Sequence, residues 1–188
     1  LHFTIHSFPT RRSSDLMDLA NSLESLGGHL NGSTGREVSM YSAYILNEHI
    51  DTALDVLADL TQNPRFKPSD IDVEKQVVLS ELMRSLEDPE ELAFDYFYQY
   101  MYHDHPLGYL ILGTPDNIRS FQHQDLVNFH TNHYIPNRMV VAAAGNIEHD
   151  TIVKYVERLF RTEPRVEPGF SGPVTAPVDK KIINMKNL

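Results

Sequence analysis

Residues 24–46, ESLGGHLNGSTGREVSMYSAYIL, carry the change of pattern that decides the fold. Just before and into this stretch, apolar residues recur at helical spacing from Met17 to Leu26, and Gly27 and Gly28 end that helix. From His29 the chain is rich in Ser, Thr, Tyr and Val, which is typical of strands, and the later glycines predict a kink. The stretch therefore predicts a helix followed by extended chain.

Helical spacing of apolar residues returns after this stretch. It predicts helices over residues 50–60, 69–85, 89–102, 124–134 and 150–160, separated by loops that contain Pro and Gly. The run RMVVAAAG, which ends at Gly145, predicts a buried strand because it is short and its residues are mostly small and apolar. Together the segments predict an α+β fold in which helices pack on a sheet.

The composition limits the partners of the chain. Of its 188 residues, 41% are hydrophobic and 22% are charged, which is enough to bury a core. A net charge of −10 repels nucleic acid and anionic membranes, so we expect neither as the main partner. No apolar run is long enough to span a bilayer, no targeting signal is recognisable, and the absence of cysteine excludes disulfides and thiolate metal sites. The compartment stays open between bacterial cytoplasm, periplasm and an organelle.

Two glutamates offer the clearest chemistry. Glu74 and Glu81 lie seven residues apart in VEKQVVLSEL, which places both carboxylates on one face of a partly buried helix. A carboxylate beside apolar surface needs a partner, and a metal ion or another cation would serve, although a solvated pair of surface glutamates has the same spacing. The HDH sequence at residues 103–105 is typical of a solvated loop. His130 and His133 have no acidic partner nearby in the sequence, which favours structural roles. No motif for a serine or cysteine nucleophile is present.

Several segments together resemble one family in their order and spacing. They are ESLGGHLNGSTGRE, DVLADLTQNPRF, VEKQVVLSEL, HPLGYLILGTPDNI and NHYIPNRMVVAAAGNI. The family is that of the pitrilysin/insulinase-like zinc metallopeptidases, which includes the mitochondrial processing peptidases. The resemblance implies an N-terminal metallopeptidase domain with a mainly antiparallel sheet over residues 17–160. It further implies a linker over residues 161–178 and the start of a truncated second domain at residues 179–188.

The resemblance also implies a zinc site. In the family, two histidines of an inverted H-x-x-E-H motif and a downstream glutamate bind Zn²⁺, and the glutamate of the motif is the base that activates water. Glu81 matches the downstream ligand, and Glu74 matches a supporting acid two helical turns earlier. Asn31 matches a substrate-contacting position on an edge strand, to which an extended peptide adds as a further strand. The next residue, Gly32, stands where the family more commonly has alanine.

The first residues of the chain do not supply the complete motif. HFTIH, residues 2–6, has histidines at the outer positions, but Ile5 stands where the base should be. Residues 7–16, SFPTRRSSDL, are the peptide that a common sequencing adapter encodes in one reading frame, and His2 and His6 fit the same adapter. We therefore expect residues 1–16 to be non-native. We also expect the sheet to lack its first strands and to leave an unpaired edge and exposed apolar surface.

Two functions stay open at this stage. The first is a zinc metalloendopeptidase that cleaves extended peptides, of which the chain as given is an inactive fragment because it lacks the complete motif. The second is a non-catalytic family member, a partner or scaffold subunit of a peptidase or respiratory complex. A degenerate member has no reason to keep both Glu74 and Glu81, so the pair favours the enzyme. The expected partners are a peptide substrate and a homologous second domain or subunit. A fold with no site at all requires the segment matches to be accidental.

Overall fold

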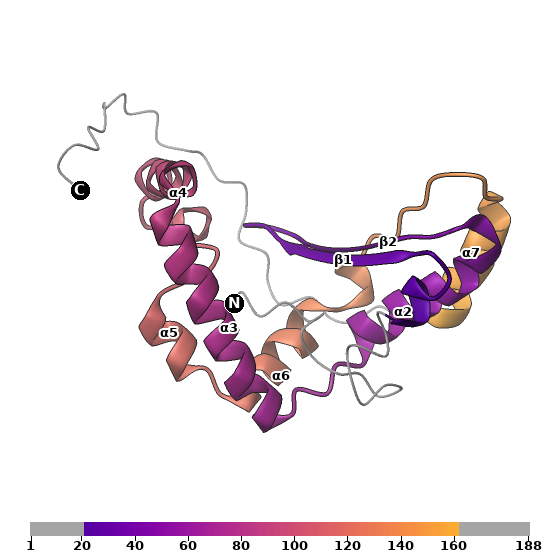
Figure 1. The fold of residues 1–188 in the computed structure, drawn as a ribbon, viewed down its shortest axis with the longest axis horizontal. Helices are drawn as coiled ribbons and strands as arrows, with labels where there is room; N and C mark the ends of the chain where they lie inside the picture. Colours follow the sequence, from indigo (N-terminus) through magenta and orange to yellow (C-terminus); the bar gives the residue numbers. More distant parts are fainter. Residues whose placement is uncertain (1–20, 162–188) are drawn as a thin grey trace.

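The computed structural model describes residues 21–161. The elements, in chain order, are β1 (His29–Thr34), β2 (Ser39–Tyr44), η2 (Asn47–His49), α2 (Ile50–Gln62), α3 (Pro68–Glu87), α4 (Pro89–Met101), η3 (Pro106–Gly108), α5 (Pro115–Ser120), α6 (His123–His133), η4 (Pro136–Arg138) and α7 (His149–Leu159), as Figure 1 shows. The expected non-native segment, the second-domain segment and all of the expected linker except residue 161 lie outside the described residues.

β1 and β2 form an antiparallel hairpin. The register pairs His29 with Tyr44 at the open end of the hairpin. At the other end, the main-chain N–H of Gly35 donates to the carbonyl oxygen of Val38 at 2.7 Å and closes the turn. The sequence predicted extended chain with a kink. The structure shows that the chain reverses completely at this point, so that the extended stretch pairs with itself.

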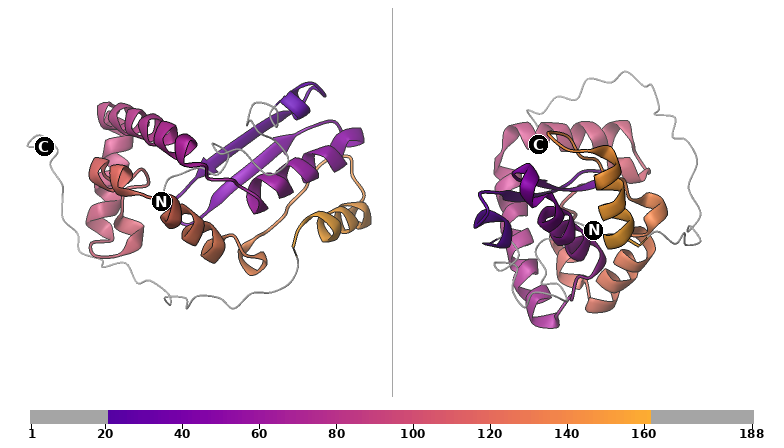
Figure 2. Two further views of the ribbon diagram at one scale, coloured as in Figure 1. Left: turned by 90° about the horizontal axis from the view of Figure 1, so that it is seen from below. Right: turned by 90° about the vertical axis from the view of Figure 1, so that its right-hand side faces the viewer.

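The base of the hairpin packs on α2. The buried members of this core are Leu23, Ala53, Val56 and Leu60. Leu30, Tyr41 and Ala43 of the strands pack against them, as does Ile45, which follows β2. Gly28 permits this approach, because a Cβ there would lie 2.9 Å from the carbonyl oxygen of Tyr44 and 3.0 Å from that of Leu23. Figure 1 shows α2 and α6 on one side of the hairpin, and Figure 1 and Figure 2 show α7 beside α2 at the open end of the hairpin. The alternating exposure along β1 agrees with this one-sided cover.

Two further cores involve α3. Near its first turns, Phe66, Ile71 and Leu126 are buried together and join the start of α3 to α6. Farther along the helix, Val78 and Leu82 are buried against Ile118 of α5. Since α3 contributes to both cores, it connects the part of the molecule that contains α6 to the part that contains α5.

Capping residues set the boundary between α3 and α4. α3 ends at Glu87 because Asp88 precedes Pro89, and the residue before a proline disfavours the helical conformation. The Asp88 side chain then accepts the main-chain N–H groups of Glu90 at 2.9 Å and Glu91 at 3.4 Å, and so caps α4. Only Asp88 separates the two helices, and they contact each other along the corner that they form.

The helices predicted after residue 50 are confirmed as α2, α3, α4, α6 and α7. The sequence interpretation missed the short helix α5. Its N-cap, Thr114, accepts a hydrogen bond from the N–H of Asn117 at 3.3 Å, and Pro115 occupies the first helical position. Within residues 21–161, every helix is too short or too polar to cross a membrane.

The buried strand predicted for RMVVAAAG is wrong. Residues 139–145 pair with neither β1 nor β2, and Val140 is 92% exposed. Met139 has the extended backbone angles φ −107° and ψ 134°. A strand needs hydrogen-bonded neighbours, and the two-stranded sheet within residues 21–161 provides none for this segment. The segment therefore exposes an apolar surface that its sequence is suited to bury.

Candidate functional site

Helix α3 carries both candidate glutamates. Glu74 is buried, with 9% of its surface exposed, and Glu81 is half-buried. Two helical turns separate them, so they project from the same side of α3. The neighbouring face of the helix packs Val78 and Leu82 into the core with Ile118. The predicted partial burial of this helix is confirmed, and the two carboxylates lie at the border of its apolar face.

Glu81 borders a cavity at the corner between α3 and α4. The cavity has a volume of about 280 Å³ and is lined by Glu81, Arg84, Ser85, Asp88, Glu91 and Leu112. Three carboxylate residues and one guanidinium give this lining an excess of negative charge, which suits a cation better than an anion. Glu74 does not line the cavity, so the two glutamates have different surroundings although they share one side of the helix.

The described residues do not complete a metal site. Within residues 21–161, no three His, Cys, Asp or Glu side chains are arranged to hold a metal ion. A catalytic zinc ion takes three protein ligands, and the two candidate glutamates of α3, Glu74 and Glu81, supply at most two. The donor set that the structure describes therefore does not fit zinc by itself. His2, Ile5 and His6 lie outside the described residues.

The HDH sequence belongs to a loop. The Nδ1 atom of His103 lies 2.8 Å from the carboxylate of Asp104, and both side chains are largely exposed. The Nδ1 atom of His105 instead accepts the main-chain N–H of Leu107 at 3.1 Å and so caps η3. These contacts agree with the predicted solvated loop.

His130 and His133 make structural contacts on α6. The Nε2 atom of His130 lies 2.8 Å from the carbonyl oxygen of Thr61, and its ring stacks on Tyr134 with 4.9 Å between centroids. The Nδ1 atom of His133 accepts a hydrogen bond from Arg138 at 3.1 Å. Partial burial of the ring and the charge of Arg138 lower the pKa of His133 below its usual value of 6.5. The two rings therefore act as packing groups, as the sequence predicted.

Asn31 lies on β1, where it is exposed and faces Ser42 in the register. Its side-chain oxygen accepts the main-chain N–H of Gly32 at 2.9 Å. Among the described residues, β1 pairs only with β2, so its other edge has no strand beside it. The structure thus places the two glutamates together on α3 and Asn31 on a different element, the hairpin.

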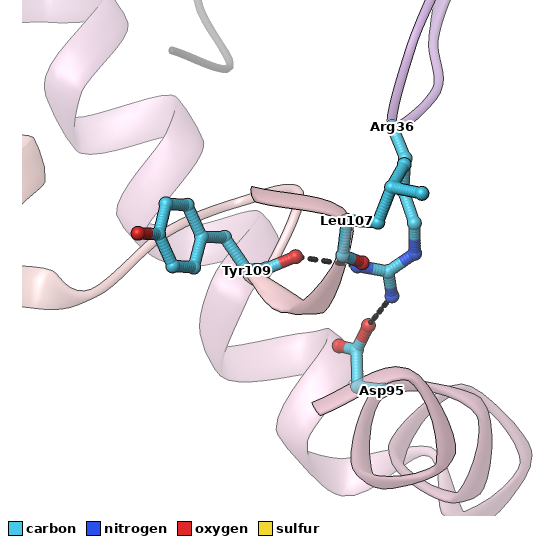
Figure 3. Close-up of polar contacts among 4 residues, drawn as sticks. All are labelled: Arg36, Asp95, Leu107 and Tyr109. Atoms are coloured by element: carbon cyan, nitrogen blue, oxygen red, sulfur yellow. Dashed lines mark hydrogen bonds and ion pairs between the residues drawn. The ribbon is translucent and has the colours of Figure 1, made fainter. Parts of the chain in front are cut away.

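Arg36 makes the contacts that sequence reasoning missed. Its Nη2 atom lies 2.7 Å from the carboxylate of Asp95, and its Nη1 atom donates to the carbonyl oxygens of Leu107, at 3.3 Å, and Tyr109. Figure 3 shows these three polar partners around the guanidinium. The Cζ atom also lies 4.0 Å from the centroid of the Tyr98 ring. The only sequence signal was the place of Arg36 in the segment ESLGGHLNGSTGRE.

Family models match most of the chain. The model of the insulinase family, peptidase family M16, matches residues 2–115, and that of the peptidase M16 inactive domain matches residues 120–186. The first match includes the HFTIH segment. It also includes β1, β2 and all of α3.

Similar proteins carry peptidase names. An uncharacterized zinc protease of Rickettsia felis is 38% identical over 160 residues, which are 85% of this chain and 39% of the relative. A probable mitochondrial-processing peptidase subunit beta of Arabidopsis thaliana is 39% identical over 142 residues, which are 76% of this chain and 27% of the relative. The chain therefore spans less than half of the length of these curated relatives.

A solved structure supports the fold. The crystal structure of a protease from Helicobacter pylori superimposes with a TM-score of 0.78 at 20% sequence identity, and the match covers 87% of this chain and 41% of that protein. At this identity the likeness concerns the fold alone. The first family model covers more than half of the chain, and so the chain belongs to the insulinase family of peptidases, peptidase family M16.

Proposed function

We propose that the full-length protein containing this chain is a zinc-dependent endopeptidase that hydrolyses peptide bonds in extended peptides. Membership of the M16 family and the similarity to proteins named zinc proteases support this function. The single observation that carries it is the position of Glu81 on α3, half-buried at the border of the apolar face and on the edge of an acidic cavity. A carboxylate in such surroundings is stabilised by a cation.

Glu81 is the proposed zinc ligand, and Glu74 is the proposed supporting acid. Since residues 21–161 do not complete a metal site, the other ligands must come from outside them. In this proposal they are the two histidines of an H-x-x-E-H motif, and the glutamate of that motif is the base. The chain as given has Ile5 at the position of the base, so in this proposal it is inactive.

The outer edge of β1 is the proposed site for the peptide. An extended peptide that adds to a strand edge gains main-chain hydrogen bonds and makes few demands on side chains. Asn31 is exposed on this strand and already bonds to the main-chain N–H of Gly32. Its amide is therefore in a position to contact a peptide beside β1.

The alternative is a non-catalytic family member. The observation that favours it is Ile5, which would remove the base if HFTIH were native. Against it stand Glu74 and Glu81, which a scaffold subunit has no chemical reason to retain together. The adapter-like sequence of residues 7–16 favours the proposal that residues 1–16 are not native.

Sequencing of the genomic region upstream of the Met17 codon, from an independent library trimmed of adapters, separates the two functions. We expect it to encode H-x-x-E-H shortly before Met17. The full-length protein should then cleave an internally quenched fluorogenic peptide, and a zinc chelator should abolish the cleavage. A native HFTIH, or full-length protein with no chelator-sensitive cleavage, would overturn the proposed function and leave the non-catalytic subunit.

A further inference from the structure

Two sets of contacts hold the base and the middle of the β1–β2 hairpin to the body of the protein. Its base packs into the core of α2, and in its middle the hydroxyl of Tyr41 lies 3.0 Å from the hydroxyl of Tyr134, which follows α6. Its tip, the turn between Thr34 and Ser39, extends beyond these contacts, and Figure 1 shows it on the side of α3 and α4. An isolated two-stranded hairpin has marginal stability, so the position of the tip depends on what holds it.

Arg36 lies in that turn and connects it to two other elements. Its guanidinium contacts Asp95 and Tyr98 on α4, and it donates to the carbonyl oxygens of Leu107 and Tyr109 in and just after η3, as Figure 3 shows for the polar partners. These partners are 59 to 73 residues away in the sequence. The side chain of Arg36 is only 12% exposed and that of Asp95 25% exposed, so the contacts are largely shielded from water.

The set of contacts is specific to arginine. A guanidinium is planar and offers five N–H donors in a fixed fork, so it can bond a carboxylate and carbonyl oxygens at once and still present a face to an aromatic ring. Lysine at this position would keep the charge near Asp95, but its ammonium is a compact group that cannot reproduce the fork or the stacking on Tyr98. A substitution of Arg36 by lysine therefore separates the effect of side-chain geometry from the effect of charge.

The partners of Arg36 are themselves fixed relative to Glu81. Asp95 and Tyr98 belong to α4, which is separated from α3 by one residue and packs on it. The η3 turn also packs on α4, and a Cβ on Gly108 would lie 3.0 Å from the carbonyl carbon of Tyr102. Glu81 lies on α3 at the same corner. A link from the hairpin tip to α4 is thus a link from β1 to the helix pair that carries Glu81.

We propose that Arg36 is a positioning residue, which fixes the edge strand that carries Asn31 relative to the α3–α4 pair that carries Glu81. Without the link, β1 stays anchored at its base and middle, and its tip moves independently of α4. The consequence for catalysis rests on the proposed function, because it assumes that peptide binds along β1 and is cleaved near Glu81. The independent motion of the hairpin tip without the Arg36 contacts does not depend on the proposed function.

The test uses the full-length protein with Arg36→Met, Arg36→Lys and Asp95→Asn. The matched controls are Arg119→Met and Asp116→Asn, because Arg119 and Asp116 form an exposed ion pair whose side chains are 63% and 97% accessible. Hydrogen exchange of residues 29–44, with residues 50–62 of α2 as internal reference, reports the motion of the hairpin. The values of kcat and KM for a fluorogenic peptide report catalysis, and thermal unfolding reports overall stability.

We expect both Arg36 variants to speed exchange at the tip of the hairpin without a change in α2. We expect kcat/KM to fall roughly ten- to a hundred-fold, mainly through kcat, because a small displacement of the peptide-binding strand misplaces the scissile bond. Arg36→Lys should be closer to wild type than Arg36→Met, since it keeps the charge beside Asp95, and Asp95→Asn should be intermediate. The two controls should behave as wild type in all three measurements.

Wild-type exchange in the hairpin of Arg36→Met would overturn the proposal. Faster exchange that is equal in the hairpin and in α2 would also overturn it, because it would show a general loss of stability. If the wild-type protein cleaves no peptide, the proposed function fails, and the exchange measurement still decides whether Arg36 holds the hairpin. If wild-type protein cleaves peptide and Arg36→Met has wild-type kcat and KM, the positioning role is excluded.

Discussion

At the scale of a residue, Gly108 allows the loop after α4 to pass close to the backbone of Tyr102. A Cβ at this position would meet the carbonyl group of Tyr102, and a backbone atom cannot move aside as the end of a side chain can. We expect Gly108→Ala to lower the free energy of unfolding by about 1–3 kcal/mol, measured by urea unfolding. Gly35→Ala is the control, because the nearest atom to its Cβ would be the Val38 carbonyl oxygen at 3.4 Å. Equal stability of the two variants would contradict the close approach.

His133 gives the protein a pH-dependent contribution to stability. Its pKa in the folded state is below 6.5, so the unfolded chain takes up the proton first as the pH falls. The contribution is therefore complete above about pH 6.5 and is lost as the pH falls below that value toward the folded-state pKa.

Urea unfolding between about pH 8 and pH 5 measures this contribution. We expect His133→Gln to show a weaker loss of stability toward low pH than the wild type. Arg138→Met should be intermediate, because the partial burial of the ring is kept while the neighbouring charge is removed. A variant His133→Gln whose pH dependence matches that of the wild type would show that His133 does not contribute.

Single-residue predictions from the sequence succeeded where the argument was local. Seven residues of spacing on a helix place Glu74 and Glu81 on one side of α3, whatever the rest of the chain does. The contacts of Arg36 could not be predicted in this way, because its partners are 59 or more residues away and depend on how the hairpin and α4 come together. The sequence also cannot show that Glu81 lines a cavity while Glu74 does not.

At the scale of elements, one side chain of α2 bonds to the C-terminal end of α7. No residue of α7 is buried, but Gln62 donates to the carbonyl oxygen of Leu159 at 3.0 Å and accepts the N–H of Arg161 at 2.8 Å. We expect Gln62→Ala to cost about 1–2 kcal/mol of stability and to speed hydrogen exchange in α7. Gln76→Ala, at an exposed position of α3, is the control and should be near neutral. Unchanged exchange in α7 of Gln62→Ala would show that other contacts hold this helix.

The elements that the sequence predicted best are those with long apolar periodicity. The helices α2, α3 and α7 repeat this pattern over several turns, so their existence is decided locally. The strand predicted for residues 139–145 failed for the opposite reason. Its apolar composition indicates burial, but a strand also needs a neighbour, and the described sheet contains only β1 and β2. The helix α5 is too short for periodicity, and only the Thr114–Pro115 pair signals its start.

At the scale of the whole molecule, the described residues form two groups joined through α3. The hairpin packs on α2, while α4 and α5 pack on α3, and Figure 1 shows the two groups on opposite sides of α6. Arg36 spans from the first group to the second. The family resemblance predicted the fold class, because the resemblance depends on several sequence segments that occur in the same order and at similar spacing. It could not predict the geometry between the groups, which depends on long-range contacts.

The central claim is that Glu81 is a zinc ligand in the full-length protein, and the zinc content of that protein tests it most directly. The measurement compares wild type, Glu81→Gln and the control Glu87→Gln, an exposed glutamate on the same helix, by elemental analysis after dialysis. We predict stoichiometric zinc in wild type and Glu87→Gln, and a fall in zinc affinity of more than about 100-fold in Glu81→Gln, with loss of peptide cleavage. Stoichiometric zinc in Glu81→Gln, or none in the wild type, would contradict the account.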